Sequence, residues 1–219
     1  MKRLTILLFA ICCLSCKSSH SQHKPDPEAI RLTNEAFFLG NDSLYIHRSD
    51  STLILKKAMN LVNKALQIDS NYFFAYRDKA DFQTKLGHPD SALTTAKFII
   101  KKWPKEISIT ISIGEYYEIK GDTISTAGYY KKALFVVNHV LDSIGVNNRR
   151  YGSRQIEKAK VLMLLNQPEK AHAILKELIE KATNDNDKQF LNGALAMNRH
   201  DILYGKTIGT KNLSTTINW

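Results

Sequence analysis

Cysteine is scarce in this sequence of 219 residues: Cys12, Cys13 and Cys16 are its three cysteines, and all lie within the first 16 positions. The rest of the chain has no thiol, which excludes a disulfide framework, a cysteine-based zinc site and a cysteine nucleophile there. A helical chain of this length does not depend on disulfides, because it buries about 70% of the surface that its unfolded form exposes.

The sequence begins with an apolar run that is too short to cross a bilayer. Residues 4–14 form this run of 11 residues, whereas a helix needs about 20 residues to span a hydrocarbon core. A retained membrane-spanning anchor is therefore not expected at this end of the chain.

The sequence also lacks a strong catalytic motif: it has no Gly-rich phosphate loop, no GxSxG elbow and no His-Glu-x-x-His. Glu115 and Glu118 are spaced to share a helix face and could serve acid–base chemistry, but such pairs are typical of a solvated face. The histidines of the main region are scattered, and we interpret them as surface or packing residues: His47, His88, His139, His172 and His200. We expect no enzymatic activity, no cofactor and no metal site.

The first 16 residues, MKRLTILLFAICCLSC, have the parts of a secretory signal peptide. A positive start precedes the apolar run, and the small Ser15 precedes Cys16. This pattern resembles a bacterial lipoprotein signal, in which the peptide is cut before a cysteine that is then lipidated. The resemblance implies a signal peptide over residues 1–15 and a lipid such as palmitate on Cys16. An ordinary signal peptide with incidental cysteines is the alternative.

Residues 16–27 are polar and contain prolines, and we interpret them as a flexible tether. Lys17, directly after the cysteine, is consistent with delivery to the outer membrane in many Gram-negative bacteria. The lipoprotein resemblance therefore implies a location in the bacterial cell envelope, lipid-anchored at the outer membrane and facing the periplasm or the cell surface. The membrane is then a partner through the N-terminal lipid, and nucleic acid is not expected as one.

Residues 107–138 predict two amphipathic helices joined by a tight turn. In the first helix, apolar residues such as Ile109 and Ile113 recur at helical spacing, so one face is apolar. Gly121 ends this helix, because glycine adopts the left-handed conformation without steric cost. The side chain of Asp122 is placed to cap the second helix.

The same plan recurs upstream, where a predicted helix over residues 71–86 is closed by Gly87. Gly87 and Gly121 lie 34 residues apart, which is the period of tetratricopeptide repeats (TPR). The two units resemble the TPR signature at Gly87, Ala92, Pro104, Gly114, Tyr117, Gly121, Tyr130 and Ala133. Gln83, where a large aromatic is usual, and Thr126, where alanine is usual, depart from it.

The resemblance implies an all-α fold: a short right-handed superhelix of antiparallel helix hairpins, of the TPR-like α-solenoid type. We expect this domain at residues 28–204, with about four hairpins and an insertion in the turn of the first. A C-terminal capping helix over residues 188–204 completes it, because open repeat arrays need a terminal element that covers the last apolar face. Residues 205–219 show no helical period and are expected to form a loose tail.

The first helix of each hairpin lines the concave face of a TPR array, so the resemblance implies a binding groove there. The candidate groove residues are Phe74, Arg77, Asp81, Ile111, Glu115, Glu118, Ile156 and Lys160. Each is equally consistent with an ordinary surface residue. The leading hypothesis is a lipid-anchored envelope scaffold that binds a protein or peptide segment in this groove.

The formal net charge is +10, and it falls to +8 when Lys2 and Arg3 are removed with the leader. Such a balance favours an anionic partner or nearby lipid headgroups, although basic residues spread over many helices are also typical of a solvated surface. The partner and the oligomeric state are not specified by any pattern in the sequence.

The alternative function is a small-ligand or glycan-binding lipoprotein of a nutrient-uptake system. It predicts a pocket lined by several aromatic side chains. The dense aromatic cluster of the sequence consists of Tyr72, Phe73, Phe74 and Tyr76. We interpret this cluster as helix packing.

Overall fold

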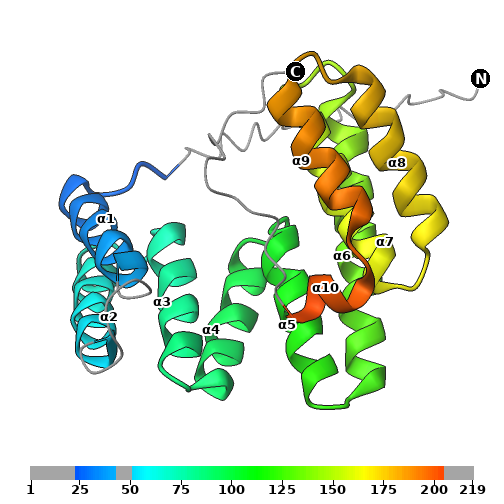
Figure 1. The fold of residues 1–219 in the computed structure, drawn as a ribbon. Coiled ribbons are helices and arrows are strands. Elements are labelled where there is room, and N and C mark those ends of the chain that lie inside the picture. The colour runs from blue at the N-terminus through cyan, green and yellow to red at the C-terminus, as the bar shows by residue number, and fades with distance from the viewer. Residues whose placement is uncertain (1–22, 43–50, 205–219) are drawn as a thin grey trace, which may run out of the picture.

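The computed structural model describes residues 23–42 and 51–204, which form ten α-helices and no strand (Figure 1). The predicted signal peptide, Cys16 and the predicted tail lie outside the described residues. None of the helices in the described ranges is both long and apolar enough to cross a membrane. The helices are α1 (Pro27–Asp42), α2 (Ser51–Ile68), α3 (Phe73–Lys85), α4 (Pro89–Lys102), α5 (Ile107–Ile119), α6 (Thr123–Ile144), α7 (Tyr151–Leu164), α8 (Pro168–Lys181), α9 (Asp185–Ala196) and α10 (Arg199–Tyr204).

The first eight helices form four hairpins, each of which packs on the next (Figure 1). Helix α1 pairs with α2, α3 with α4, α5 with α6, and α7 with α8. The predicted all-α stack of helix hairpins is confirmed. Helix α6 is longer than its counterparts, and Gly145, with a φ of 70°, follows its last residue.

The turns inside the hairpins depend on residues with positive φ. Gly87 (φ 79°) follows α3 and Gly121 (φ 77°) follows α5, while Asn166 (φ 58°) takes this place after α7. In each turn the amide of the next residue donates to the carbonyl oxygen five residues earlier, at 2.8, 3.0 and 2.8 Å. These bonds satisfy carbonyl groups that the end of a helix leaves free, as in the Schellman motif.

The C-terminal end has two helices where the sequence predicts one over residues 188–204. Met197 has an extended backbone, with φ −75° and ψ 136°. Asn198 and Asp201 then exchange side chain to backbone hydrogen bonds of 2.9 and 3.1 Å, an N-terminal capping arrangement that starts a new helix. Helix α9 packs on α8 and α10 on α7, so the two share the covering of this end of the stack.

The chain enters the first hairpin beside Asp69, a carboxylate that is only 6% exposed. Its oxygens accept hydrogen bonds from the backbone amides of Asn71 (2.9 Å) and Asp26 (3.1 Å), and Nε2 of His23 lies within 2.9 Å of both. Burial raises the pKa of Asp69, but the hydrogen bonds outweigh it and hold the pKa below its ordinary value. The last residues of the predicted flexible tether are therefore fastened to the turn between α2 and α3.

Helices α5 and α6 meet where Gly114 faces the ring of Tyr130. A Cβ built on Gly114 would lie 2.5 Å from a ring carbon. Tyr130 is 1% exposed, and its hydroxyl donates to Oε2 of Glu118 at 2.7 Å. Burial and the Glu118 carboxylate both raise the pKa of the Tyr130 hydroxyl, which keeps its proton on the oxygen. Because Gly114 on α5 has no side chain, the Tyr130 ring of α6 can pack directly against the α5 backbone.

Alanine at position 114 is expected to destabilise the fold by about 1–3 kcal/mol, because the added methyl group overlaps the Tyr130 ring in a packed interior. Gly128 is a matched control, since it also lies inside a helix but its Cβ would meet nothing within 4 Å. Gly128→Ala is expected to stabilise by about 0.5–1 kcal/mol. Urea denaturation measures both changes, and a stabilising Gly114→Ala would contradict the packing described.

Candidate functional site

A groove lies between α3 and α5, with α4 beneath it. Its volume is about 590 Å³, within the roughly 300–1,000 Å³ that is common for binding pockets. Helix α4 packs on both α3 and α5, whereas the neighbouring first helices α1 and α3, and α5 and α7, pack directly on each other. The stack is therefore open between the second and third hairpins.

Small and apolar side chains form the interior of this groove. Its small members are Ala80, Ala92, Ala96 and Ser112, and its larger apolar members are Leu93, Ile109, Ile113 and Ile119. Ile119 is 68% exposed at the edge. Alanines on α3 and α4 leave the volume that larger side chains would fill, so the groove presents an apolar surface that a partner's side chains can cover.

The rim of the groove is charged, and three of its charged side chains are paired within the protein. The pairs are Arg77–Asp78, Asp81–Lys85 and Glu115–Lys160, at 2.8, 2.8 and 2.9 Å. Lys120, also on the rim, has its Nζ 5.7 Å from the centre of the Tyr116 ring. Because positive and negative groups alternate, the rim does not select a partner by charge of one sign.

Three of the predicted groove residues, Arg77, Asp81 and Glu115, line this groove. Phe74 lies one turn before Arg77 on α3, is 46% exposed, and has its ring 4.9 Å from the Arg77 guanidinium carbon. Lys160 reaches the groove indirectly, through its ion pair with Glu115.

The other predicted groove residues lie elsewhere. Ile111 is 2% exposed and belongs to the core between α5, α6 and α7. Ile156 is half-buried and packs against the core of the last hairpin. Glu118 lies in a second depression, beside Tyr130 and Arg199. Helical spacing placed these residues on the first helices, but it did not distinguish the side that packs on the next hairpin from the side that faces the groove.

Sequence reasoning missed the contribution of α4, which forms the base of the groove. The signal was present as the alanines of α4 at helical spacing, Ala92 and Ala96, although this spacing is equally typical of helix-packing positions. It also missed Asp78, which is 4% exposed and has one carboxylate oxygen without a hydrogen-bond partner in the described structure. Burial raises the pKa of Asp78 despite its pairing with Arg77.

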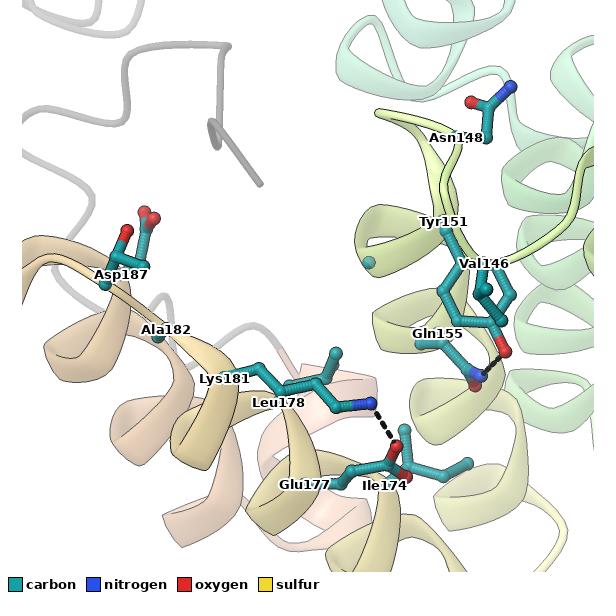
Figure 2. A pocket seen from close by; sticks show the side chains of 12 residues that line it. Val146, Asn148, Tyr151, Gln155, Ile174, Glu177, Leu178, Lys181, Ala182 and Asp187 are labelled. Carbon is teal, nitrogen blue, oxygen red and sulfur yellow. Dashed lines mark hydrogen bonds and ion pairs between the residues drawn. The ribbon is translucent and has the colours of Figure 1, made fainter.

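A smaller cavity of about 240 Å³ lies between α7 and α8, below the loop that follows α6 (Figure 2). Gln155 donates to the Tyr151 hydroxyl at 2.9 Å on α7, and Lys181 contacts Glu177 at 2.6 Å along α8. Tyr151 is the single aromatic residue among those that line it. A glycan site with several aromatic walls, which the alternative function predicts, does not match this lining.

The aromatic cluster of α3 is occupied by contacts within the protein. The ring of Phe73 lies 5.4 Å from that of Trp103, and Tyr76 lies 4.8 Å from Phe98. Nζ of Lys102 lies 4.9 Å from the Trp103 ring and donates to a backbone carbonyl of the turn before α3 at 2.7 Å. These contacts join the start of α3 to the end of α4, in agreement with the interpretation as helix packing.

Arg199 fastens α10 to two earlier helices. Its Nε donates to the Leu164 carbonyl at the end of α7 at 3.1 Å, and its guanidinium forms an ion pair with Glu118 of α5. Glu118 also accepts the Tyr130 hydroxyl hydrogen bond. One arginine therefore joins the terminal helix to the third and fourth hairpins.

Replacing Arg199 with glutamine is expected to destabilise the fold by about 1–2 kcal/mol, because the half-buried Glu118 and the Leu164 carbonyl lose their partner. Arg31→Gln is the control, since Arg31 forms its ion pairs on an exposed face of α1, where such pairs contribute about 0–1 kcal/mol. Urea denaturation with a Glu118→Gln double-mutant cycle measures the coupling. Equal effects of the two arginine variants would contradict the role assigned to Arg199.

Comparison with known proteins rests on structure, because no protein-family model and no curated protein matches the sequence. A thermophilic TPR protein of Thermus thermophilus is similar, with a TM-score of 0.51 and 22% identity over 80% of this chain and 86% of that chain. The TPR-like repeats of a putative Podosopora anserina kinesin light chain give a TM-score of 0.49 and 12% identity over 83% and 90%. At the identity of the first match the similarity shows the fold alone: this chain has the helix-hairpin stack of TPR proteins.

Proposed function

We propose that this protein is a lipid-anchored scaffold of the bacterial cell envelope that binds a segment of another protein in the groove between α3 and α5. The observation that carries the proposal is the groove between these helices, where α3 and α5 do not pack on each other and Leu93, Ile109 and Ile119 are partly or fully exposed. A partner's apolar side chains would gain free energy by covering this surface.

The charged rim supports binding of a protein segment. Arg77, Asp81 and Glu115 already form ion pairs within the protein. A bound segment can therefore cover the apolar interior without burying an unpaired charge. The small residues of the floor allow a bound segment to approach the helix backbone closely. The described residues contain no group of three or more histidine, cysteine, aspartate or glutamate side chains that could hold a metal ion.

The anchor in this proposal is a lipid on Cys16, supported by the leader sequence. One acyl chain binds a membrane reversibly, whereas two or more hold stably. A stable anchor would keep the groove near envelope partners and raise their effective concentration. His23, seven positions after Cys16 in the sequence, already contacts Asp69 of the folded domain. A lipid on Cys16 would therefore hold the groove near the membrane.

Filling the groove tests the binding site. Ser112 and Ser108 are both exposed on α5, but Ser112 lines the groove and Ser108 does not. The probes are peptides selected from a displayed random library for binding to the wild-type protein. Ser112→Tyr is expected to raise their Kd at least about tenfold, or ~1.4 kcal/mol, because the tyrosine ring occupies the groove. Ser108→Tyr is expected to leave the Kd unchanged. Peptides that bind both variants like wild type would show that the groove is not the binding site.

Palmitate labelling tests the anchor. In a Gram-negative host, the wild-type chain and Cys12→Ala are expected to incorporate labelled palmitate and to fractionate with membranes. Cys16→Ala is expected to lose the label and to be released from membranes by a high-salt wash, because lipid attaches to that sulfur and salt screens any remaining electrostatic attachment. A variant Cys16→Ala that still carries label would refute the assignment of this cysteine.

A further inference from the structure

The second helices of the first three hairpins, α2, α4 and α6, lie on the outer side of the stack. Helix α1 packs on α3 and α5 packs on α7, whereas α3 and α5 stand apart at the groove. Within the described ranges, α2 with α4 and α4 with α6 have no comparable contact. In a curved stack of hairpins, the helices that stand apart from one another form the outer face.

Charge is distributed unevenly between the two sets of helices. The outer helices α2, α4 and α6 carry eight lysines and two carboxylates, and α2 has no acidic residue at all. Helices α1, α3 and α5 carry four arginines and lysines against seven carboxylates. The excess positive charge of this half of the protein therefore lies on its outer side.

The lysines of the outer helices are exposed and are not paired with carboxylates. They are Lys56, Lys57, Lys64, Lys97, Lys101, Lys102, Lys131 and Lys132. None of them forms an ion pair with another described residue, whereas the cations that do so lie on α1, α3, α7, α8, α10 and the segment before α1. Lys97 contacts the Tyr117 ring, and Lys102 contacts the Trp103 ring and donates to a backbone carbonyl of the turn before α3. All eight lysines remain exposed, so their charge is available for an external anionic surface.

The outer helices also expose large apolar side chains beside their lysines. Leu53 on α2 is 56% exposed, Phe98 on α4 is 42% exposed and Phe135 on α6 is 73% exposed. Each lies three or four residues from a lysine on the same helix, so that both share one face. Lysines beside bulky apolar groups are typical of helices that lie on a lipid bilayer, where the charge meets headgroups and the apolar group enters the boundary.

We propose that this lysine face, defined as the eight outer lysines with Leu53, Phe98 and Phe135, docks on the surface of an anionic lipid bilayer. Its positive charge is complementary to anionic headgroups. Its exposed apolar side chains can enter the boundary of the bilayer, which a partner that offers only negative charge does not provide. A nucleic acid would match the lysines, but its phosphate backbone offers no apolar environment for Leu53.

The lysine face and the groove use different residues, including on the helix that they share. On α4 the groove is lined by Pro89, Ala92, Leu93 and Ala96, whereas the lysine face consists of Phe98 and the three lysines of this helix. Docking through the lysine face therefore leaves the groove open. The inference stands independently of peptide binding and of the lipid on Cys16.

Vesicle sedimentation at low salt tests the proposal, with the full chain in every variant so that residues 1–22 contribute equally throughout. The test variant combines Lys56→Gln, Lys101→Gln and Lys132→Gln, one lysine from each outer helix. The control combines Lys170→Gln, Lys176→Gln and Lys181→Gln on α8, where three carboxylates balance the lysines. Both triple variants remove the same net charge.

The test variant is expected to bind phosphatidylglycerol vesicles on the order of 100-fold more weakly than wild type, from about fivefold for each lysine. The control is expected to weaken binding by less than about threefold. Phe135→Ala is expected to weaken it about fivefold, through its apolar contact. Added salt is expected to reduce the difference between wild type and the test variant.

Equal weakening by the two triple variants would overturn the proposal, because net charge alone would then account for binding. Equal wild-type affinity for phosphatidylglycerol and phosphatidylcholine vesicles would also overturn it. A DNA duplex that binds more tightly than phosphatidylglycerol vesicles at the same salt would assign the lysine face to nucleic acid instead. Circular dichroism of each variant verifies that the helices are intact.

Discussion

The helices of this protein bury their apolar stripes against the partner helix of the same hairpin and against the next hairpin, and the fold depends on how closely these helices approach. Small residues set that distance: Ala58, Ala75 and Ala133 are fully buried, and Gly114 accepts the ring of Tyr130. A stack of this kind is stabilised by nearest neighbours. Its ends therefore need their own covering, which α9 and α10 provide at the C-terminal end with Arg199 as the link to α5 and α7.

The groove arises where this close approach is interrupted. Between the second and third hairpins, α4 carries the packing and α3 and α5 stand apart, so Leu93, Ile109 and Ile119 remain partly or fully exposed along a groove. The charged rim is paired internally, which limits the electrostatic cost of covering it. The hydrophobic effect that stabilises the fold would also favour binding, because covering exposed apolar surface is favourable in free energy.

The outer side of the stack contributes a second kind of surface. The lysines of α2, α4 and α6 have no ion-pair partner in the described structure, while the arginines of α1, α3 and α10 are held by carboxylates. A chain whose inner side binds a protein segment and whose outer side contacts lipid headgroups would be oriented at a membrane by two separate features. These features reside on different residues, so each can be altered alone.

The sequence by itself determined the local structure: the glycines and prolines that end and start the helices, the period of 34 residues, and the apolar stripes. These signals act between residues close in the chain, and the hairpins match them. The sequence also predicted Arg77, Asp81 and Glu115 as groove residues, and they line the groove between α3 and α5. The tertiary structure decided the rest, because it depends on contacts between distant residues. It put Ile111 in the core, made α4 the base of the groove, broke the terminal helix at Met197 and brought Arg199 to Glu118. Helical periodicity fixes which residues share a face, but only the packing of neighbouring helices fixes what that face meets.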